Sequence, residues 1–193
     1  FRHDYINILT SLKLGIDNQD IEAIKTVYNG VLRDSANQFY DSKFDIAKLS
    51  NIKNDAIKSI LSAKLLEAQN RGISISVEIE EPVSNFRIEL LDFITVLSIL
   101  CDNAIEATIK ATSPRMTVVF INNDDSLVLI VENSIKSEKV DVSHIFARGY
   151  SSKGEGRGLG LHNVNSILEK YPKSTITTRS ANHLFSQTIR FCK

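Results

Sequence analysis

The sequence feature with the clearest chemical meaning is a cluster of glycines. Five of the eight glycines in the 193-residue chain fall within one twelve-residue window: Gly149, Gly154, Gly156, Gly158 and Gly160. Glycines let backbone N–H groups converge on an anion, and a helix that follows adds its free N–H groups and its dipole. The segment therefore predicts a phosphate-binding loop, with a merely flexible loop as the alternative. It is not a Walker loop, because it lacks the Gly-Lys-Ser/Thr ending, nor a dinucleotide fingerprint, because no strand leads directly into it.

A second candidate site lies in the apolar segment from Leu90 to Ala111, which indicates a long and mostly buried helix. This helix contains the polar run Asp102-Asn103-Ala104-Ile105-Glu106-Ala107. Burying such groups without partners is unfavourable, so the run faces either solvent or something charged. Asn103 and Glu106 are three residues apart, on one side of the helix. An Asn oxygen suits a Mg²⁺ ion that bridges nucleotide phosphates, whereas an ordinary exposed helix edge is the alternative.

The first forty residues predict two helices. Apolar residues recur at three- and four-residue steps from Phe1 to Ile16, while His3, Asn7 and Thr10 share a polar face. After the turn-forming residues 15–20, a second helix is expected from about Ile21 to Tyr40. A lone hairpin of this kind leaves its apolar stripe exposed, so we expect two copies to dimerise into a four-helix bundle.

The remainder of the chain predicts an α+β unit. A helix from about residue 57 to 71 is followed by alternation from Ile73 to Ile79, which is typical of a strand. After the long helix, a hairpin is expected over 116–121 and 127–131, then a helix to about residue 170, then strands over 175–179 and 185–191 around a turn near Asn182. The sheet is expected to be mixed or mainly antiparallel, with its helices on one face. The predicted domains are 1–48 and 49–193.

Composition excludes several classes of protein. Lys plus Arg and Asp plus Glu both number 23, and this balance offers no electrostatic footprint for nucleic acid. No apolar stretch reaches the roughly 20 residues needed to span a bilayer. Cys101 and Cys192 stand far apart in apolar runs, which favours buried thiols in a reducing compartment over a disulfide. Because the chain opens at Phe1, we expect a fragment whose preceding part could hold membrane helices.

Together, the asparagine helix and the glycine segment resemble the GHKL group of ATP-binding domains. That group includes sensor histidine kinases, gyrase-type topoisomerases and mismatch-repair ATPases. The resemblance covers about residues 51–193 and implies an α/β sandwich that binds ATP, with Mg²⁺ on Asn103. It also implies a lid over the triphosphate whose hinge is the segment Gly154 to Leu161, and the stretch 145–153 is similar to the phenylalanine-containing lid of the kinases. The expected nucleotide-binding residues are Asn103, Glu106, Asn133, Lys153, Gly154, Gly156, Arg157, Gly158, Leu159, Gly160 and Leu161.

The start of the chain selects among the members of this group. Phe1-Arg2-His3-Asp4-Tyr5-Ile6-Asn7 resembles the phospho-acceptor box of the peptide-pheromone (quorum-sensing) histidine kinases of Gram-positive bacteria, the accessory-gene-regulator and competence receptor class. A histidine near a terminus is by itself an ordinary surface residue. Upstream of a kinase-like ATP domain, it is expected to be the phosphorylated residue.

Two departures from the wider pattern are informative. Most histidine kinases recognise adenine with Asp in an Asp-x-Gly-x-Gly box, whereas Val131-Glu132-Asn133-Ser134 stands here. Asn133 is expected to take that place, since an Asn can accept from the adenine amino group and donate to a ring nitrogen. Hydrolytic members, and many other histidine kinases, carry a glutamate four residues before the magnesium asparagine, where this chain has Ile99. That difference counts against a topoisomerase-like ATPase.

The resemblance implies autophosphorylation of His3 by ATP and transfer of the phosphoryl group to an aspartate of a response regulator. Asp4 is expected to accept a hydrogen bond from the histidine ring and so to strengthen the nucleophile. Lys153 and Arg157 are candidate phosphate contacts, with solvated lid charges as the alternative. Asn7, one helical turn after His3, is a candidate for orienting water in a phosphatase reaction.

The partners implied are a second copy of the chain, a response regulator and a peptide signal bound by an absent membrane domain. The implied location is the cytoplasmic face of the cell membrane. Two other functions stay open at this point: a GHKL ATPase or serine-directed anti-sigma-type kinase, and a nucleotide-binding regulatory scaffold.

Overall fold

The computed structural model describes residues 2–27, 46–143, 145 and 160–193. The chain divides into two compact units, residues 1–43 and 44–193. In the first unit, α1 (Arg2–Asp17) confirms the helix predicted from the apolar periodicity. Residues 21–27 are helical as well, and the rest of the predicted second helix lies outside the described residues.

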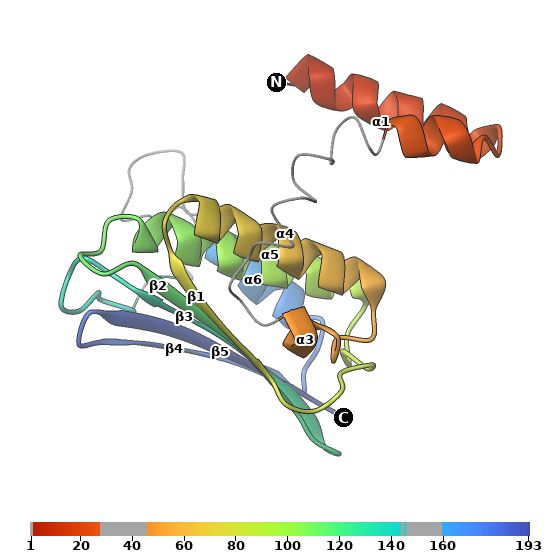
Figure 1. The fold of residues 1–193 in the computed structure, drawn as a ribbon. Helices are drawn as coiled ribbons and strands as arrows, with labels where there is room; N and C mark the ends of the chain where they lie inside the picture. Colours follow the sequence, from red (N-terminus) through yellow and green to blue (C-terminus); the bar gives the residue numbers. More distant parts are fainter. Residues whose placement is uncertain (1, 28–45, 144, 146–159) are drawn as a thin grey trace. The chain divides into compact units, whose positions relative to one another are not determined.

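The second unit is built on one five-stranded sheet (Figure 1). Its strands are β1 (Ser74–Ile79), β2 (Arg115–Asn122), β3 (Ser126–Ser134), β4 (Ser174–Ala181) and β5 (Leu184–Cys192). Their order across the sheet is β1-β2-β3-β5-β4, with β1 parallel to β2 and every other pair antiparallel. The predicted mixed sheet is confirmed, although β2, β3, β4 and β5 all extend beyond their predicted bounds.

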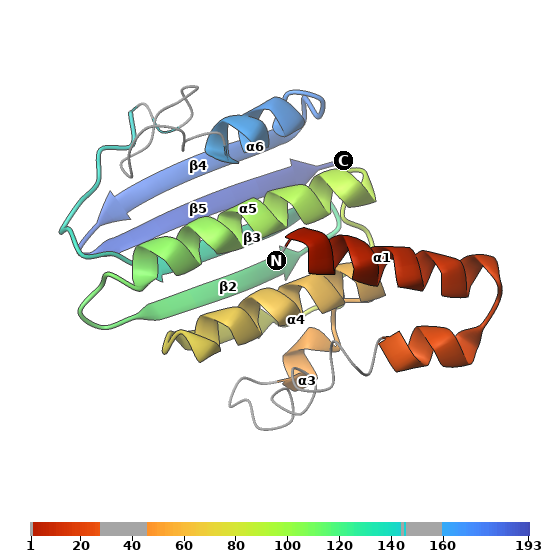
Figure 2. The same ribbon diagram turned by 90° about the horizontal axis from the view of Figure 1, so that it is seen from above.

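Three helices cover one face of this sheet: α4 (Asp55–Asn70), α5 (Leu90–Thr108) and α6 (Gly160–Leu168). Seen from above, α5 lies between α4 and α6 (Figure 2). The short helix α3 (Ile46–Leu49) precedes α4. This arrangement confirms the expected helices on one face of an α+β unit.

The core lies between the sheet and these helices. Alternate residues of each strand point toward the helices, so the apolar positions of β2, β3 and β5 meet the buried stripe of α5. Phe93 of α5 is fully buried and contacts the rings of Phe86, Phe120 and Phe191, at centroid distances of 4.6, 6.4 and 5.5 Å. This aromatic group fixes the beginning of α5 on the sheet.

Local signals in the sequence set the ends of several elements. Asn54 caps α4 by accepting from the backbone N–H groups of Ala56 and Ile57, and Gly72 at φ 76° follows the end of that helix. Asn182 and His183, at φ 52° and 60°, form the tight turn predicted between the last two strands. Within the described part of the chain, no helix is long and apolar enough to cross a membrane.

Candidate nucleotide site

The centre of the candidate site is the point where the beginning of α6 meets α5. A Cβ atom on Gly160 would lie 3.2 Å from Cγ2 of Ile99, and 3.7 and 3.9 Å from the amide nitrogen and oxygen of Asn103. Residues 99 and 103 are one turn apart, so both face the first residue of α6. Glycine thus lets the N-terminus of α6 approach the Asn103 amide. The structure brings together Asn103 and the last glycine of the cluster, as the phosphate-site hypothesis requires.

The other predicted residues of the second unit occupy different positions. Glu106 lies on the exposed side of α5, and Leu161 is the second residue of α6. Asn133 lies inside β3, where it is 2% exposed, rather than in a segment after the hairpin. Its amide nitrogen donates to the backbone oxygen of Ser134 at 2.9 Å. The other predicted nucleotide-binding residues lie outside the described residues: Lys153, Gly154, Gly156, Arg157, Gly158 and Leu159.

The predicted phospho-acceptor residues belong to the first unit. The backbone of His3, Asp4 and Asn7 lies in α1, which keeps residues 3 and 7 one turn apart. Their side chains lie outside the described part of the structure. Their roles therefore stay predictions.

The polar run on α5 has a partner on α4. Lys64 of α4 forms an ion pair with Asp102, the residue before Asn103, and the two side chains are 23% and 47% exposed. The run thus borders both solvent and an opposite charge. The neighbouring residue on the core side is Cys101. Burial, with Asp102 nearby, raises the pKa of its thiol to about 12. Both cysteines are free thiols, as predicted; Cys101 is buried and Cys192 is half-buried.

The opposite end of the α5–α6 pair carries a closed polar network. The Tyr171 hydroxyl donates to the Asp92 carboxylate at 2.7 Å, and Lys170 donates to the same group at 3.2 Å. The backbone N–H of Glu89 donates to the Tyr171 oxygen at 3.2 Å. The hydrogen bond from Tyr171 lowers the pKa of Asp92, and burial, with the bond to Asp92, raises the pKa of Tyr171.

Two polar side chains of the sheet with buried polar atoms were missed from the sequence. Gln187 of β5 is 2% exposed, and its amide nitrogen has no hydrogen-bond partner among the described residues. Thr178 of β4 lies opposite Gln187 in the strand register, and its buried hydroxyl also has no hydrogen-bond partner among the described residues. A signal was present, because Gln187 interrupts a row of apolar residues, Phe185, Ile189 and Phe191, at the two-residue period of a strand.

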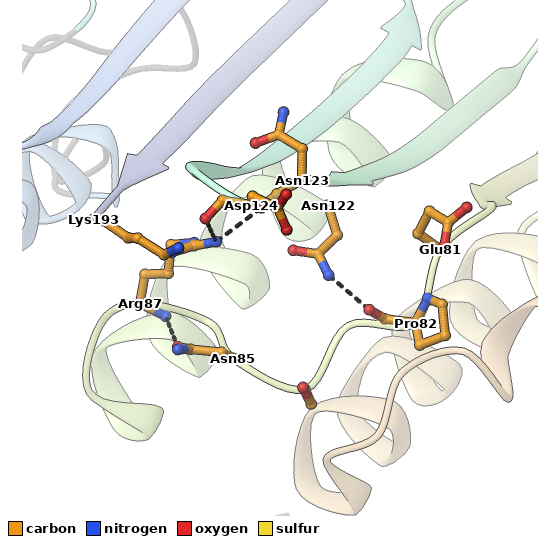
Figure 3. A pocket seen from close by; sticks show the side chains of 9 residues that line it. Glu81, Pro82, Asn85, Arg87, Asn122, Asn123, Asp124 and Lys193 are labelled. Carbon is orange, nitrogen blue, oxygen red and sulfur yellow. Dashed lines mark hydrogen bonds between the residues drawn. The ribbon is translucent and has the colours of Figure 1, made fainter.

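A separate pocket of about 460 Å³ lies at the β2–β3 turn (Figure 3). The Arg87 guanidinium donates to the backbone oxygens of Asn123 and Asp124 at 2.9 and 3.2 Å, and Asn122 donates to Pro82 at 2.7 Å. These bonds join the segment before α5 to the hairpin. None of the residues predicted to bind nucleotide lines this pocket.

Comparison with known proteins identifies the class to which this geometry belongs. Residues 88–192, more than half of the chain, match the GHKL domain family. The chain therefore belongs to the GHKL family, as the two sequence motifs indicated.

Two relatives are sensor proteins. CitS of Bacillus subtilis strain 168 is described as a sensor protein and is 28% identical over 177 residues, which is 87% of this chain and 30% of CitS. The sensor histidine kinase DcuS of Escherichia coli K12 is 27% identical over 190 residues, 96% of this chain and 33% of DcuS. The chain thus spans about a third of the length of the relatives it matches.

Solved structures support the same fold. The catalytic domain of histidine kinase ThkA superimposes with a TM-score of 0.61 at 20% identity, covering 73% of this chain and 92% of that domain. Full-length ShkA in complex with AMPPNP gives a TM-score of 0.58 at 15% identity, covering 76% of this chain and 30% of ShkA.

Proposed function

We propose that the chain is the kinase part of a sensor histidine kinase of a two-component system, and that this kinase uses ATP to phosphorylate His3. The observation that carries the proposal is the Asn103 amide at the N-terminus of α6, directly after the glycine cluster, in a GHKL domain. Relatives described as sensor proteins and a structural neighbour solved with an ATP analogue support it.

The donor set around Asn103 fits a magnesium ion that arrives with the nucleotide. Among the described residues, no group of three or more His, Cys, Asp or Glu side chains could hold a metal by itself. Asn103 offers one hard oxygen, and nucleotide phosphates would complete the coordination. When bound, the ion would neutralise charge on the phosphates, while the N–H groups at the beginning of α6 attract them.

The proposed reaction transfers the γ-phosphoryl group to the imidazole of His3. The lone pair of one ring nitrogen attacks the γ-phosphorus, a nitrogen–phosphorus bond forms, and the bond to the bridging oxygen breaks to release ADP. The proton of the other ring nitrogen passes to the Asp4 carboxylate. Lys153 and Arg157 are proposed to contact the phosphates from the lid. The phosphoryl group then passes to an aspartate of a response regulator.

Ile99 favours transfer over hydrolysis. Residue 99 lies one helical turn before Asn103, and the Ile99 side chain packs against Gly160. A hydrocarbon side chain cannot take a proton from water, so this position supplies no base for attack of water on the phosphate. The proposal therefore prefers a kinase over a GHKL ATPase.

Several finer parts of the proposal rest mainly on the sequence motifs. These are dimerisation through the N-terminal helices, attachment to the cytoplasmic face of the membrane, the peptide-pheromone class of signal and a phosphatase role for Asn7. Exposed apolar side chains on the first unit, Leu14, Ile16 and Ile21 at 56%, 63% and 63%, support the dimer.

The proposal is tested by incubating the chain, extended upstream of residue 1, with γ-labelled Mg-ATP and mapping the labelled residue. The expected label is acid-labile, alkali-stable and located on His3. His3→Gln should lose the label and keep the affinity for nucleotide, because residue 3 lies outside the GHKL match. An acid-stable label, or a label that survives His3→Gln, would contradict the assignment.

A further inference from the structure

The buried face of the sheet below Asn103 carries more polar side chains than packing explains. Val131 is a core residue of β3 and pairs with Gln187, which pairs in turn with Thr178 of β4. Paired residues of neighbouring strands point to the same face, and so do residues two apart on one strand. Asn133, Gln187 and Thr178 therefore all face the helices. We call these three residues the polar floor.

The polar floor lies at the level of the candidate nucleotide site. The hydroxyl of Thr108 on α5 donates to the backbone oxygen of Ser134, which places the ends of α5 and β3 together. Asn103 lies five residues before Thr108, which is about 7.5 Å along the axis of α5. Val131, the strand partner of Gln187, lies three residues before Ser134, which is about 10 Å along β3. Gln187 thus lies within a few ångströms of Asn103 along the helix axis.

The unpaired atoms of the polar floor require a partner. Buried donors in folded proteins nearly always have a hydrogen-bond acceptor, and a buried amide without one costs free energy. Gln187 Nε2 lacks an acceptor among the described residues, as the buried Thr178 hydroxyl lacks a partner. A replacement of Gln187 by an apolar residue would suit the surrounding core better, so the amide is explained by something that binds it.

The hydrogen-bonding pattern of the floor matches the edge of adenine. The bond from Asn133 Nδ2 to Ser134 fixes the Asn133 amide and leaves its Oδ1 as the acceptor offered to a ligand. Gln187, the diagonal neighbour of Asn133 across β3 and β5, offers a free donor. Adenine presents an amino donor next to the ring acceptor N1, whereas guanine presents an acceptor next to a donor. Diagonal neighbours in a sheet are close enough for long side chains to address one base.

We propose that Gln187 donates to N1 of adenine while Asn133 accepts from the 6-amino group, so that the pair selects ATP over GTP. This inference rests on the proposed ATP-binding function and deepens it. It revises the sequence-based hypothesis, in which Asn133 alone made both contacts. The Thr178 hydroxyl extends the polar floor beside Gln187, where it can hold a water against the base.

The test measures the affinity of the 193-residue chain for Mg-ATP, Mg-GTP and Mg-1-deaza-ATP, in which a C–H group replaces N1. The wild-type chain should bind 1-deaza-ATP about tenfold more weakly than ATP, the effect of one neutral hydrogen bond. Gln187→Leu should bind the two equally, at about the affinity of the wild type for 1-deaza-ATP. The matched control is Thr188→Val, the next residue of β5 on the opposite face, which should keep the tenfold preference.

The outcomes separate the two proposals. If the wild-type chain binds no Mg-ATP, the proposed function and this inference both fall. If it binds ATP and 1-deaza-ATP equally, or if Gln187→Leu keeps the preference, only the role of Gln187 is contradicted. The partner of its amide is then a buried water. Gln187→Met provides the same comparison should the leucine variant fail to fold, and the measurement on the wild-type chain needs no variant.

Discussion

The two ends of the α5–α6 pair have opposite polar character. At the beginning of α5, Tyr171 and Lys170 both donate to the Asp92 carboxylate, and the Tyr171 oxygen also accepts from a backbone N–H. At the other end, Asn103 faces Gly160, and the amide of Gln187 below it has no partner among the described residues. The Asp92 end therefore holds a closed network of side chains, whereas on the sheet below the other end the buried amide of Gln187 is left without a partner among the described residues.

This difference separates stability from binding. A closed network of hydrogen bonds stabilises the fold and has nothing left to offer a ligand. Groups left unpaired in a buried position lower stability unless a ligand satisfies them. We therefore expect substitutions at the Asp92 end to change the free energy of unfolding, and substitutions at the Asn103 end to change the affinity for nucleotide.

The largest expected effect is that of Asn103→Ala on binding of Mg-ATP. The substitution removes the only metal ligand that the proposal takes from this chain, so affinity measured by calorimetry should fall by about a hundredfold, as for loss of a contact to a charged group. The free energy of unfolding without nucleotide should change by less than about 0.5 kcal/mol, because the side chain is not part of the core.

The matched control for this prediction is Asn165→Ala on α6. The Asn165 amide donates to Glu169 on the exposed side of that helix at 3.0 Å. Its loss should leave the affinity for Mg-ATP unchanged. Equal affinities of the Asn103→Ala and wild-type chains would remove Asn103 from the site.

The candidate site was predictable from the sequence to the extent that its signals are local. The glycine cluster and the polar run around Asn103 are contiguous, and helical spacing alone relates Asn103 to Ile99. The pair of Lys64 with Asp102 joins residues 38 positions apart, so it depends on how α4 rotates against α5, which periodicity does not fix. Asn133 was predicted as a candidate from its place in the motif, but its position inside β3 depends on strand pairing beyond the predicted hairpin.

A second expected effect is a loss of stability in Tyr171→Phe. This substitution removes a hydrogen bond to a carboxylate, and the free energy of unfolding should fall by about 1 kcal/mol in urea titrations at pH 7. The affinity for Mg-ATP should remain that of the wild type. A variant that weakened nucleotide binding while keeping its stability would reverse the assignment of the two ends.

The pH dependence of this loss follows from the pKa of Asp92, which folding lowers. A group whose pKa is lower in the folded chain stabilises the fold above its unfolded pKa, and the stabilisation is lost as the pH falls through the folded value. The difference in stability between wild type and Asp92→Asn should therefore be full at pH 7 and shrink below about pH 4. A difference that stayed constant down to pH 2 would contradict the role of the charge.

The smallest expected effect concerns the reactivity of Cys101, which lies on α5 between the two ends. Burial raises the pKa of this thiol to about 12, so iodoacetamide at pH 8 should reach it only when the chain opens, and after the half-buried Cys192. Labelling of an opened state follows its equilibrium population when closing is fast. Tyr171→Phe, which costs about 1 kcal/mol, should accordingly speed labelling of Cys101 by about fivefold, whereas Asn103→Ala without nucleotide should leave the rate unchanged. Equal acceleration by both substitutions would mean that the Asn103 end also stabilises the fold, and the separation of the two ends would not hold.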